Sequence, residues 1–195
     1  RQDLDVHLVD LSAVALSQAA DNAARLGASR VRLHRAELWP ELGLNPDRTV
    51  IVANLPYVPD ATVESDQTLR AEPRMALAGG PDGLDVIRRF LAELDRRRFY
   101  PRALLLEHGH DQADSLASMF AHDPTLHRDL AGHARVSEAG PAHFGRPAGA
   151  GAIPPAGAAT ESASSASRLA SRRSCLIHGR PLPRSPVASC IRLNA

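Results

Sequence analysis

Residues 49–57 read TVIVANLPY, a near-continuous apolar run that ends in an asparagine and a proline. Such a run is typical of a strand buried on both faces, because parallel sheets are covered by helices on each side. Periodicity predicts three further strands at residues 6–9, 31–34 and 103–107, and three helices at residues 11–26, 83–97 and 111–120. Because strands and helices alternate along the chain, the sequence predicts an α/β fold with a mostly parallel sheet and helices on both faces.

Polar residues follow or end three of these strands. Asp10, Asn54 and Glu107 each stand at the carboxyl end of a predicted strand. Ligands of open α/β sheets bind at this edge, outside the carboxyl ends of the strands. We therefore expect the functional site where these three residues converge.

The composition divides the chain into two parts. At 195 residues there is room for one domain of ordinary size. Residues 1–138 hold the periodic elements, whereas residues 139–195 are dominated by Ala, Gly, Pro, Ser and Arg with no sustained period. The sequence thus predicts a partial domain over residues 1–138 and a low-complexity, disordered tail over residues 139–195.

Charge, cysteine and hydropathy patterns narrow the class of protein. Acidic residues outnumber arginines in residues 1–138, with no basic stripe of interleaved aromatics, so no stable nucleic-acid binding is expected. Cys175 and Cys190 both lie in the tail, and no apolar run is long enough to cross a bilayer. These features favour a cytoplasmic protein without membrane contact. Since the chain begins at Arg1 rather than Met, we expect it to be a fragment.

The chemistry of the expected site is carried by Asn54-Leu55-Pro56-Tyr57. An amide nitrogen is a poor nucleophile because its lone pair is delocalised, so an enzyme that methylates it must aim acceptors at both of its N–H bonds. The Asn54 side-chain oxygen and the Leu55 carbonyl can supply these acceptors, and Tyr57 offers a flat face to the planar group. Pro56 biases Leu55 away from the helical region. The alternative is an ordinary strand end at which asparagine begins a turn and Pro-Tyr closes it.

Two earlier positions are candidates for binding a nucleoside. An acid at the end of a strand in a nucleoside-binding sheet commonly accepts hydrogen bonds from ribose hydroxyls, which suits Asp10. Asp10 could equally cap the following helix, a role for which Ser12 is as good a candidate. In the loop after residues 31–34, Glu37 could accept from an exocyclic amine, or it could be a solvated surface charge.

Four segments together resemble the glutamine N5-methyltransferases of the HemK type. They read VHLVDLSAVALSQAADNAARLG (residues 6–27), VIVANLPYVP (50–59), EPRMALAGGPDGLDVIRRFL (72–91) and LLLEHGHDQ (104–112). The resemblance implies a Rossmann-like class I methyltransferase fold and S-adenosylmethionine as cofactor. It also implies N5-methylation of the GGQ glutamine of peptide chain release factors as the reaction; a sister group modifies a glutamine of a large-subunit ribosomal protein.

The resemblance also implies roles for individual residues. Asp10 matches the acid that binds the ribose, and Glu37 and Leu38 match the loop beside the adenine. Asn54, Leu55, Pro56 and Tyr57 match the substrate-binding tetrapeptide, with Asn54 also near the cofactor and with Asn54 and Tyr57 as the catalytic pair. No metal is implied.

The chain departs from the family pattern at three places. Leu55 stands where the tetrapeptide usually has its first proline. The first strand of the family and its glycine-rich cofactor loop have no counterpart, so the sheet is expected to be incomplete at the N-terminus. The closing strand should follow residues 129–132, yet the sequence turns to Ser-Glu-Ala-Gly-Pro after Val136, which predicts a second incomplete edge.

Two other functions fit part of the pattern. An amino-methyltransferase acting on adenine in nucleic acid shares the Asn54 motif but would need basic surface around the site. A truncated, non-catalytic fragment of the family would account for the missing glycine loop. A metal site is rejected, because residues 82–85 lack the ligand spacing of a calcium loop and no third ligand accompanies His108 and His110.

Overall fold

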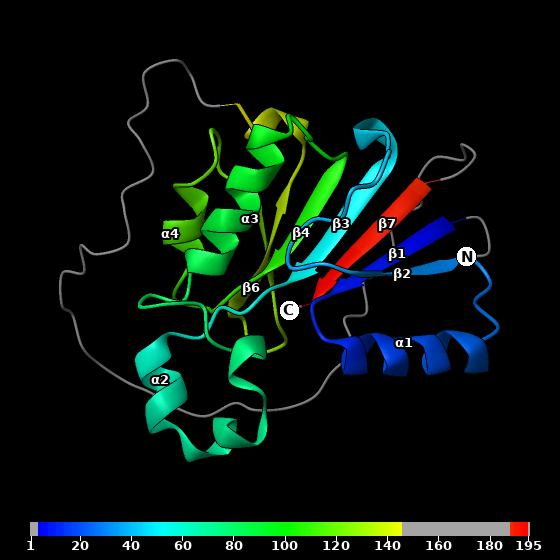
Figure 1. Cartoon of the computed structure of the whole chain (residues 1–195). Helices are drawn as coiled ribbons and strands as arrows, with labels where there is room; N and C mark the ends of the chain where they lie inside the picture. Colours follow the sequence, from blue (N-terminus) through cyan, green and yellow to red (C-terminus); the bar gives the residue numbers. More distant parts are fainter. Residues whose placement is uncertain (1–3, 146–187, 195) are drawn as a thin grey trace.

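The computed structural model describes residues 4–145 and 188–194, which form a seven-stranded sheet flanked by helices (Figure 1). The strands are β1 (Leu4–Asp10), β2 (Val31–Arg35), β3 (Thr49–Asn54), β4 (Ala103–Glu107), β5 (Thr125–Arg128), β6 (Ala134–Ala139) and β7 (Ala188–Asn194). The helices are α1 (Ala13–Arg25), α2 (Asp60–Ser65), α3 (Asp85–Arg96) and α4 (Ala113–Ala117). Short 3₁₀ turns lie at Pro46–Arg48, Gln67–Ala71, Arg74–Ala76 and Pro141–His143.

The sheet is mostly parallel, as the sequence predicts. Its order is β2-β1-β7-β3-β4-β6-β5. The first five strands in this order run parallel, whereas β6 is antiparallel to β4 and β5 is antiparallel to β6. The chain moves from β1 to β2 in one direction along the sheet and from β3 to β4 in the other. Because such crossovers are right-handed, α1 and α3 cover opposite faces, and the direction of winding reverses between β1 and β3.

The centre of the core lies under α3. Figure 1 shows α3 and α4 beside β3, β4 and β6, and α1 beside β1 and β2. Ile87, Phe90 and Leu94 recur at helical spacing on α3 and are fully buried. They share one apolar cluster with Ile51 of β3 and Leu104 of β4. This cluster fixes the half of the sheet that carries the Asn54 motif.

Helix α1 is capped at both ends but buries none of its residues. The Ser12 side chain accepts the backbone N–H of Ala15 at 3.2 Å, which makes Ser12 the N-cap. Gly27 follows the helix with a φ of +62°, the conformation that favours glycine after a C-cap. No residue of α1 is buried, and Val14 and Leu26 are largely exposed. The predicted helix over residues 11–26 is therefore confirmed, although it packs loosely on its sheet.

A hairpin corrects the prediction that the domain ends at residue 138 with an open edge. Strand β6 continues through Ala139 and pairs with β4, and β5 pairs with β6 outside it. The turn between them forms because the Asp129 carboxylate accepts the backbone N–H of His133 at 3.0 Å, while Gly132 takes a φ of +85°. The edge that was expected to be incomplete is thus extended by two strands, β6 and β5.

The region predicted as a disordered tail contributes a central strand. Strand β7 lies between β1 and β3 and pairs in parallel with both. The backbone N–H and C=O groups on the facing edges of β1 and β3 therefore find hydrogen-bond partners in β7. The prediction for residues 139–195 is therefore wrong for β7, while residues 146–187 lie outside the described residues. The described sheet also has no gap between β1 and β3, although the sequence predicts a missing strand. Within residues 4–145, no helix is long and apolar enough to cross a membrane.

Candidate active site

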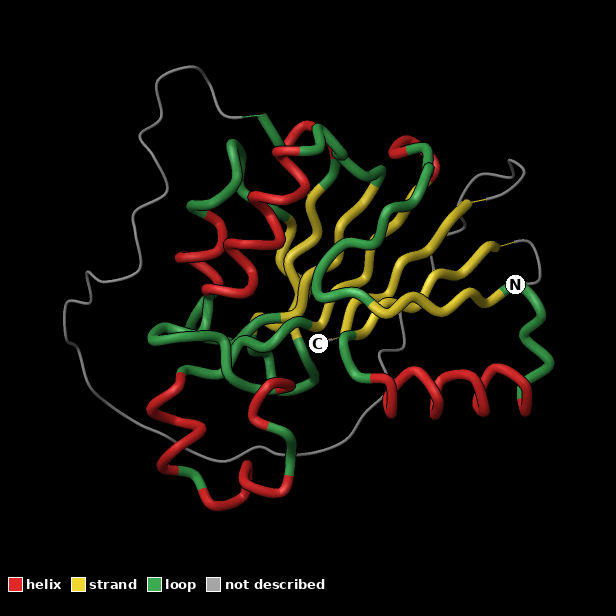
Figure 2. Tube along the Cα trace, in the orientation of Figure 1, coloured by secondary structure: helices red, strands yellow, loops and turns green. Residues whose placement is uncertain are grey.

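Three polar residues form a row across the carboxyl edge of the sheet. The residues just before Asp10 and Asn54 both pair with Leu193 of β7, so Asp10 and Asn54 lie at the same level. The register of β3 with β4 places Glu107 beside Asn54. Figure 2 shows the loops that follow these strands leaving the same edge. With neighbouring strands about 4.8 Å apart, the Cα atoms of Asp10 and Asn54 are separated by about 10 Å.

Asp10 is buried, and its carboxylate faces the start of the following loop. Its exposed fraction is 6%, and its Oδ1 accepts the backbone N–H of Ser12 at 2.7 Å. Because Ser12 itself caps α1, Asp10 is not the N-cap. The second carboxylate oxygen accepts no hydrogen bond from residues 4–145. A carboxylate fixed in this way can accept hydroxyl donors such as those of a ribose.

The Asn54 motif leaves β3 with its side chains divided between solvent and core. Asn54 is exposed, whereas Leu55 and Pro56 are buried and Tyr57 is partly buried. No hydrogen bond involves the Asn54 side chain among the described residues, so its amide oxygen is available as an acceptor. Leu55, which is 2% exposed, belongs to the apolar cluster under α3 and anchors the turn.

Tyr57 is fixed by Glu107. The Tyr57 hydroxyl donates to Glu107 Oε1 at 3.1 Å across the edge of the sheet. Burial, followed by the charge of Glu107 and this hydrogen bond, raises the pKa of Tyr57 to about 12. The phenol is therefore neutral at physiological pH, and its ring presents a fixed aromatic face near Asn54.

A glycine-rich loop pairs with the chain just after the Asn54 motif. The Val58 N–H donates to the Leu77 carbonyl at 2.9 Å, and the Gly79 N–H donates to the Val58 carbonyl at 2.9 Å. The Asp60 N–H then donates to the Gly80 carbonyl at 2.9 Å. A Cβ at Gly79 would lie 2.7 Å from the Pro56 carbonyl oxygen, so this approach requires a glycine. Two of the segments that resemble the family, residues 50–59 and 72–91, are thus joined by backbone hydrogen bonds.

The loop that carries Glu37 and Leu38 begins beside Asp10. The Ala36 N–H donates to the Asp10 carbonyl at 3.3 Å. Leu38 packs against the apolar cluster, and the exposed Glu37 forms an ion pair with Arg89 of α3. The structure therefore places the start of this loop beside Asp10 and packs Leu38 on the apolar cluster, but it directs the Glu37 carboxylate toward an opposite charge on α3.

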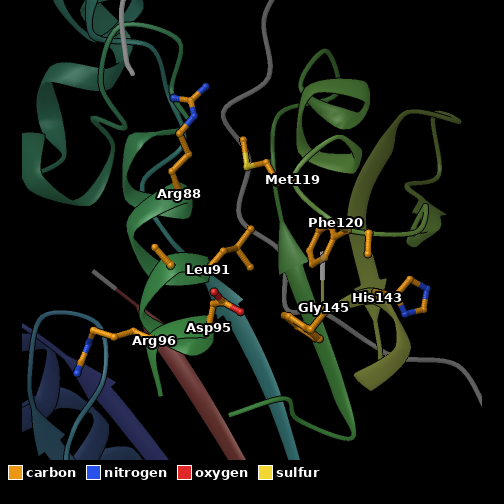
Figure 3. Close-up of a pocket in the computed structure, with 11 residues that line it drawn as sticks. Arg88, Leu91, Asp95, Arg96, Met119, Phe120, His143 and Gly145 are labelled. Atoms are coloured by element: carbon orange, nitrogen blue, oxygen red, sulfur yellow. The ribbon is translucent and has the colours of Figure 1, made fainter. Parts of the chain in front are cut away.

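Neither of two cavities in the described part of the chain contains the Asn54 motif. The first, of about 220 Å³, lies between α3, the end of α4 and the 3₁₀ turn at Pro141–His143 (Figure 3). The second, of about 280 Å³, is polar and begins three residues beyond Glu107; its lining includes His110, Asp111 and Arg128. Residues 4–145 contain no group of three or more side chains placed to bind a metal ion.

One residue of the region was missed by the sequence analysis. Gln112 follows β4 in the segment LLLEHGHDQ, and its buried side chain bonds to the loops around Tyr57 and Asp82. The glutamine gives no periodic or compositional signal, because its role depends on contacts between segments that are distant in sequence.

Residues of the described chain fit part of an S-adenosylmethionine site. The buried Asp10 carboxylate suits a ribose, and the available Asn54 oxygen belongs to a residue at the same level of the sheet, at the reversal of winding where nucleosides bind. Asp10 thus fits the nucleoside side of such a site, and Asn54 fits the side that holds the methyl acceptor.

Comparison with known proteins gives close relatives. No family model matches the chain. The chain is 42% identical over 118 residues to the release factor glutamine methyltransferase of Moorella thermoacetica, covering 58% of this chain and 41% of the relative. It is 36% identical over 138 residues to that of Pseudomonas aeruginosa, covering 68% of this chain and 49% of the relative.

A second group of relatives carries a different substrate in its name. The chain is 40% identical over 109 residues to the ribosomal protein uL3 glutamine methyltransferase of Bordetella pertussis, covering 55% of this chain and 36% of the relative. The chain thus spans about half, or less, of the length of the curated relatives it matches.

Proposed function

We propose that the whole protein transfers a methyl group from S-adenosylmethionine to the N5 nitrogen of a glutamine side chain, because the chain is 36–42% identical to release factor and ribosomal protein uL3 glutamine methyltransferases over the part that it shares with them. The GGQ glutamine of a peptide chain release factor is the proposed substrate, and the cytoplasm, where release factors act, is the proposed location. The observation that supports this most directly is the row of Asp10, Asn54 and Glu107 at the reversal of winding.

Asn54 and Leu55 are the proposed acceptors for the substrate amide. The Asn54 side-chain oxygen accepts one N–H of the glutamine, and the Leu55 backbone carbonyl accepts the other. As the nitrogen attacks, positive charge develops on it, and two oxygen dipoles aimed at its hydrogens stabilise that charge. The fixed ring of Tyr57 stacks on the planar amide and keeps its lone-pair direction toward the methyl donor.

Asp10 and Leu38 are the proposed contacts on the cofactor side. S-adenosylmethionine supplies an electrophilic methyl group when it is bound. The Asp10 carboxylate accepts the ribose hydroxyls, and Leu38 offers an apolar surface to the adenine. Glu37, matched by resemblance to the adenine-side loop, would have to leave Arg89 in order to accept from the adenine amine.

The cofactor proposal is tested by calorimetric titration of S-adenosylmethionine into the chain. Asp10→Asn removes the charge that accepts the hydroxyls, so we expect binding to weaken by about 10- to 100-fold. Asp21→Asn, on the exposed surface of α1, is the matched control and should bind as the unmodified chain does. Equal binding by both variants would refute the role of Asp10.

The substrate proposal is tested by transfer of a labelled methyl group to a purified release factor. Asn54→Ala removes one acceptor, and we expect the rate to fall by about 100- to 1000-fold, as for loss of a preorganised donor or acceptor dipole. Asn22→Ala on α1 is the control. A chain that neither binds S-adenosylmethionine nor transfers label would instead be the non-catalytic fragment of the family.

Two other acceptors are distinguished by the same assay. A ribosomal protein is favoured by the names of some relatives, and it would take the label in place of the release factor. Adenine in nucleic acid is disfavoured, because acidic residues outnumber arginines in residues 1–138.

A further inference from the structure

Gln112 lies where three loops of the candidate active site meet. Its side chain is 6% exposed. Its nitrogen donates to the backbone carbonyl of Tyr57 at 2.9 Å and to that of Asp82 at 2.9 Å. Its oxygen accepts the backbone N–H of Gly109 at 2.8 Å. Both N–H bonds and the carbonyl oxygen of the amide are used, so its orientation follows from its partners.

An uncharged amide of this length fits these partners. Two backbone carbonyls require two donors, and one backbone N–H requires an acceptor; only asparagine and glutamine side chains combine these groups in one amide. A carboxylate at position 112 would turn an acceptor toward two other acceptors. An apolar side chain would leave three buried backbone groups without a partner, and such groups are rare in folded proteins.

Two glycines give Gln112 the space that it occupies. A Cβ at Gly83 would lie 2.5 Å from Gln112 Nε2 and would overlap the Tyr57 carbonyl oxygen. Gly83 also has a φ of +77°, which side-chain-bearing residues rarely adopt. A Cβ at Gly109 would lie 2.9 Å from Gln112 Oε1. The backbone on both sides of Gln112 is therefore shaped around its amide.

The contact with Tyr57 links Gln112 to the proposed acceptors. Glu107 holds the Tyr57 hydroxyl, and Gln112 holds the Tyr57 carbonyl, so both ends of the residue are fixed. Leu55 and Asn54 immediately precede it in a turn stiffened by Pro56. A displacement of about 1 Å in a positioning group can lower a rate about a hundredfold.

We infer that Gln112 is a positioning residue for methyl transfer: through the Tyr57 carbonyl it holds the Asn54 and Leu55 acceptors in the geometry that the substrate amide needs. This inference rests on the proposed function. Gln112 touches neither substrate nor cofactor, so its loss should affect kcat rather than the binding of either.

The test compares Gln112→Met, which keeps the unbranched shape without polar groups, with Gln112→Glu, which keeps one acceptor and removes both donors. Gln18→Met on the exposed surface of α1 is the matched control. For both Gln112 variants we expect kcat for release factor methylation to fall about a hundredfold. We expect the KM for release factor and the Kd for S-adenosylmethionine to stay within about twofold.

Amide hydrogen exchange gives a readout that needs no activity. The N–H groups of Val58 and Gly79 bond between the two loops that Gln112 joins. In Gln112→Met their exchange should become about tenfold faster, whereas amides within β4 and α3 should keep their rates. Equal acceleration throughout the chain would mean that Gln112 acts on global stability alone, and it would overturn the inference.

The outcomes separate this inference from the proposed function. If the unmodified chain transfers no methyl group to the release factor, the proposed function fails, and unchanged exchange at Val58 and Gly79 in Gln112→Met would show that the positioning role fails as well. If the unmodified chain is active and Gln112→Met retains its kcat, the inference is wrong and the proposed function stands. Full kcat in Gln112→Asn alongside a loss of kcat in Gln112→Met would also contradict the inference, because the shorter asparagine side chain cannot reach all three partners.

Discussion

Tyr57 should titrate far above an ordinary tyrosine. Burial is the largest cause that raises the pKa of Tyr57 to about 12, and the Glu107 carboxylate that accepts its hydroxyl at 3.1 Å adds to the effect. An ordinary phenol has a pKa of about 10. At pH 11 about nine tenths of an ordinary tyrosine is ionised, but only about one tenth of folded Tyr57 should be.

The same difference predicts how stability depends on pH. A rise in pKa from about 10 to about 12 corresponds to about 3 kcal/mol in favour of the neutral phenol in the folded state. Because the folded pKa is the higher one, this contribution is fully present below about pH 10 and is lost as the pH rises through about 12. The free energy of unfolding should therefore fall across this alkaline window.

The chain has two tyrosines, which makes the assay simple. Tyr100→Phe leaves Tyr57 as the only phenol, and phenolate absorbance is read immediately after a stopped-flow pH jump, before the chain can unfold. Glu107→Gln should lower the midpoint while leaving it above 10, because burial remains. Tyr57→Phe isolates Tyr100, whose pKa is raised mainly by its hydrogen bond to Asp95. A midpoint near 10 for Tyr57 in the folded chain would refute the reasoning.

Three further changes test the fold around the site. Phe90→Ala should lower the free energy of unfolding by about 3–5 kcal/mol in urea titrations, because it empties the centre of the core. Gly83→Ala should destabilise by more than about 1 kcal/mol and should slow methyl transfer, since it combines a positive φ with overlap at the Tyr57 carbonyl. Removal of Ala188–Asn194 should speed amide exchange in both β1 and β3, because each loses its ladder to β7.

Each of these predictions has its own control. Leu130→Ala, at a fully exposed side chain, should leave the free energy of unfolding nearly unchanged beside Phe90→Ala. Gly132→Ala has a similar positive φ but open space around it, so it separates backbone strain from overlap. If exchange in β1 and β3 is the same with and without Ala188–Asn194, then β7 does not hold the two halves of the sheet together.

The sequence predicted the buried strands well because their signal is local. TVIVA and ALLLE are short apolar runs bounded by polar residues, and they match β3 and β4 closely. Asp10, Asn54 and Glu107 follow from the same reasoning, since parallel strands bring their carboxyl ends to one edge. The sequence does not reveal that Asp10 and Asn54 lie at the same level, because this depends on the register of β1 and β3 with β7.

Other features depend on contacts that a single segment does not reveal. Every residue of β5 is exposed, so it lacks the apolar alternation by which a strand is found. Strand β7 follows a long Ala-, Ser-, Pro- and Arg-rich stretch, and the biased composition of that stretch obscures the short strand pattern of residues 188–194. Gln112 and Gly83 become meaningful only when the loops after β3 and β4 are brought together in space.

The central claim is that the methyl acceptor is the side-chain nitrogen of a protein glutamine. The most direct test incubates the chain with S-adenosylmethionine bearing a deuterated methyl group, a release factor and an adenine-containing oligonucleotide in one reaction, and then locates the label by tandem mass spectrometry. The account predicts label on the GGQ glutamine of the release factor, lost in Asn54→Ala and retained in Asn22→Ala. Label on adenine, or on no glutamine although calorimetry shows that the cofactor binds, would contradict it.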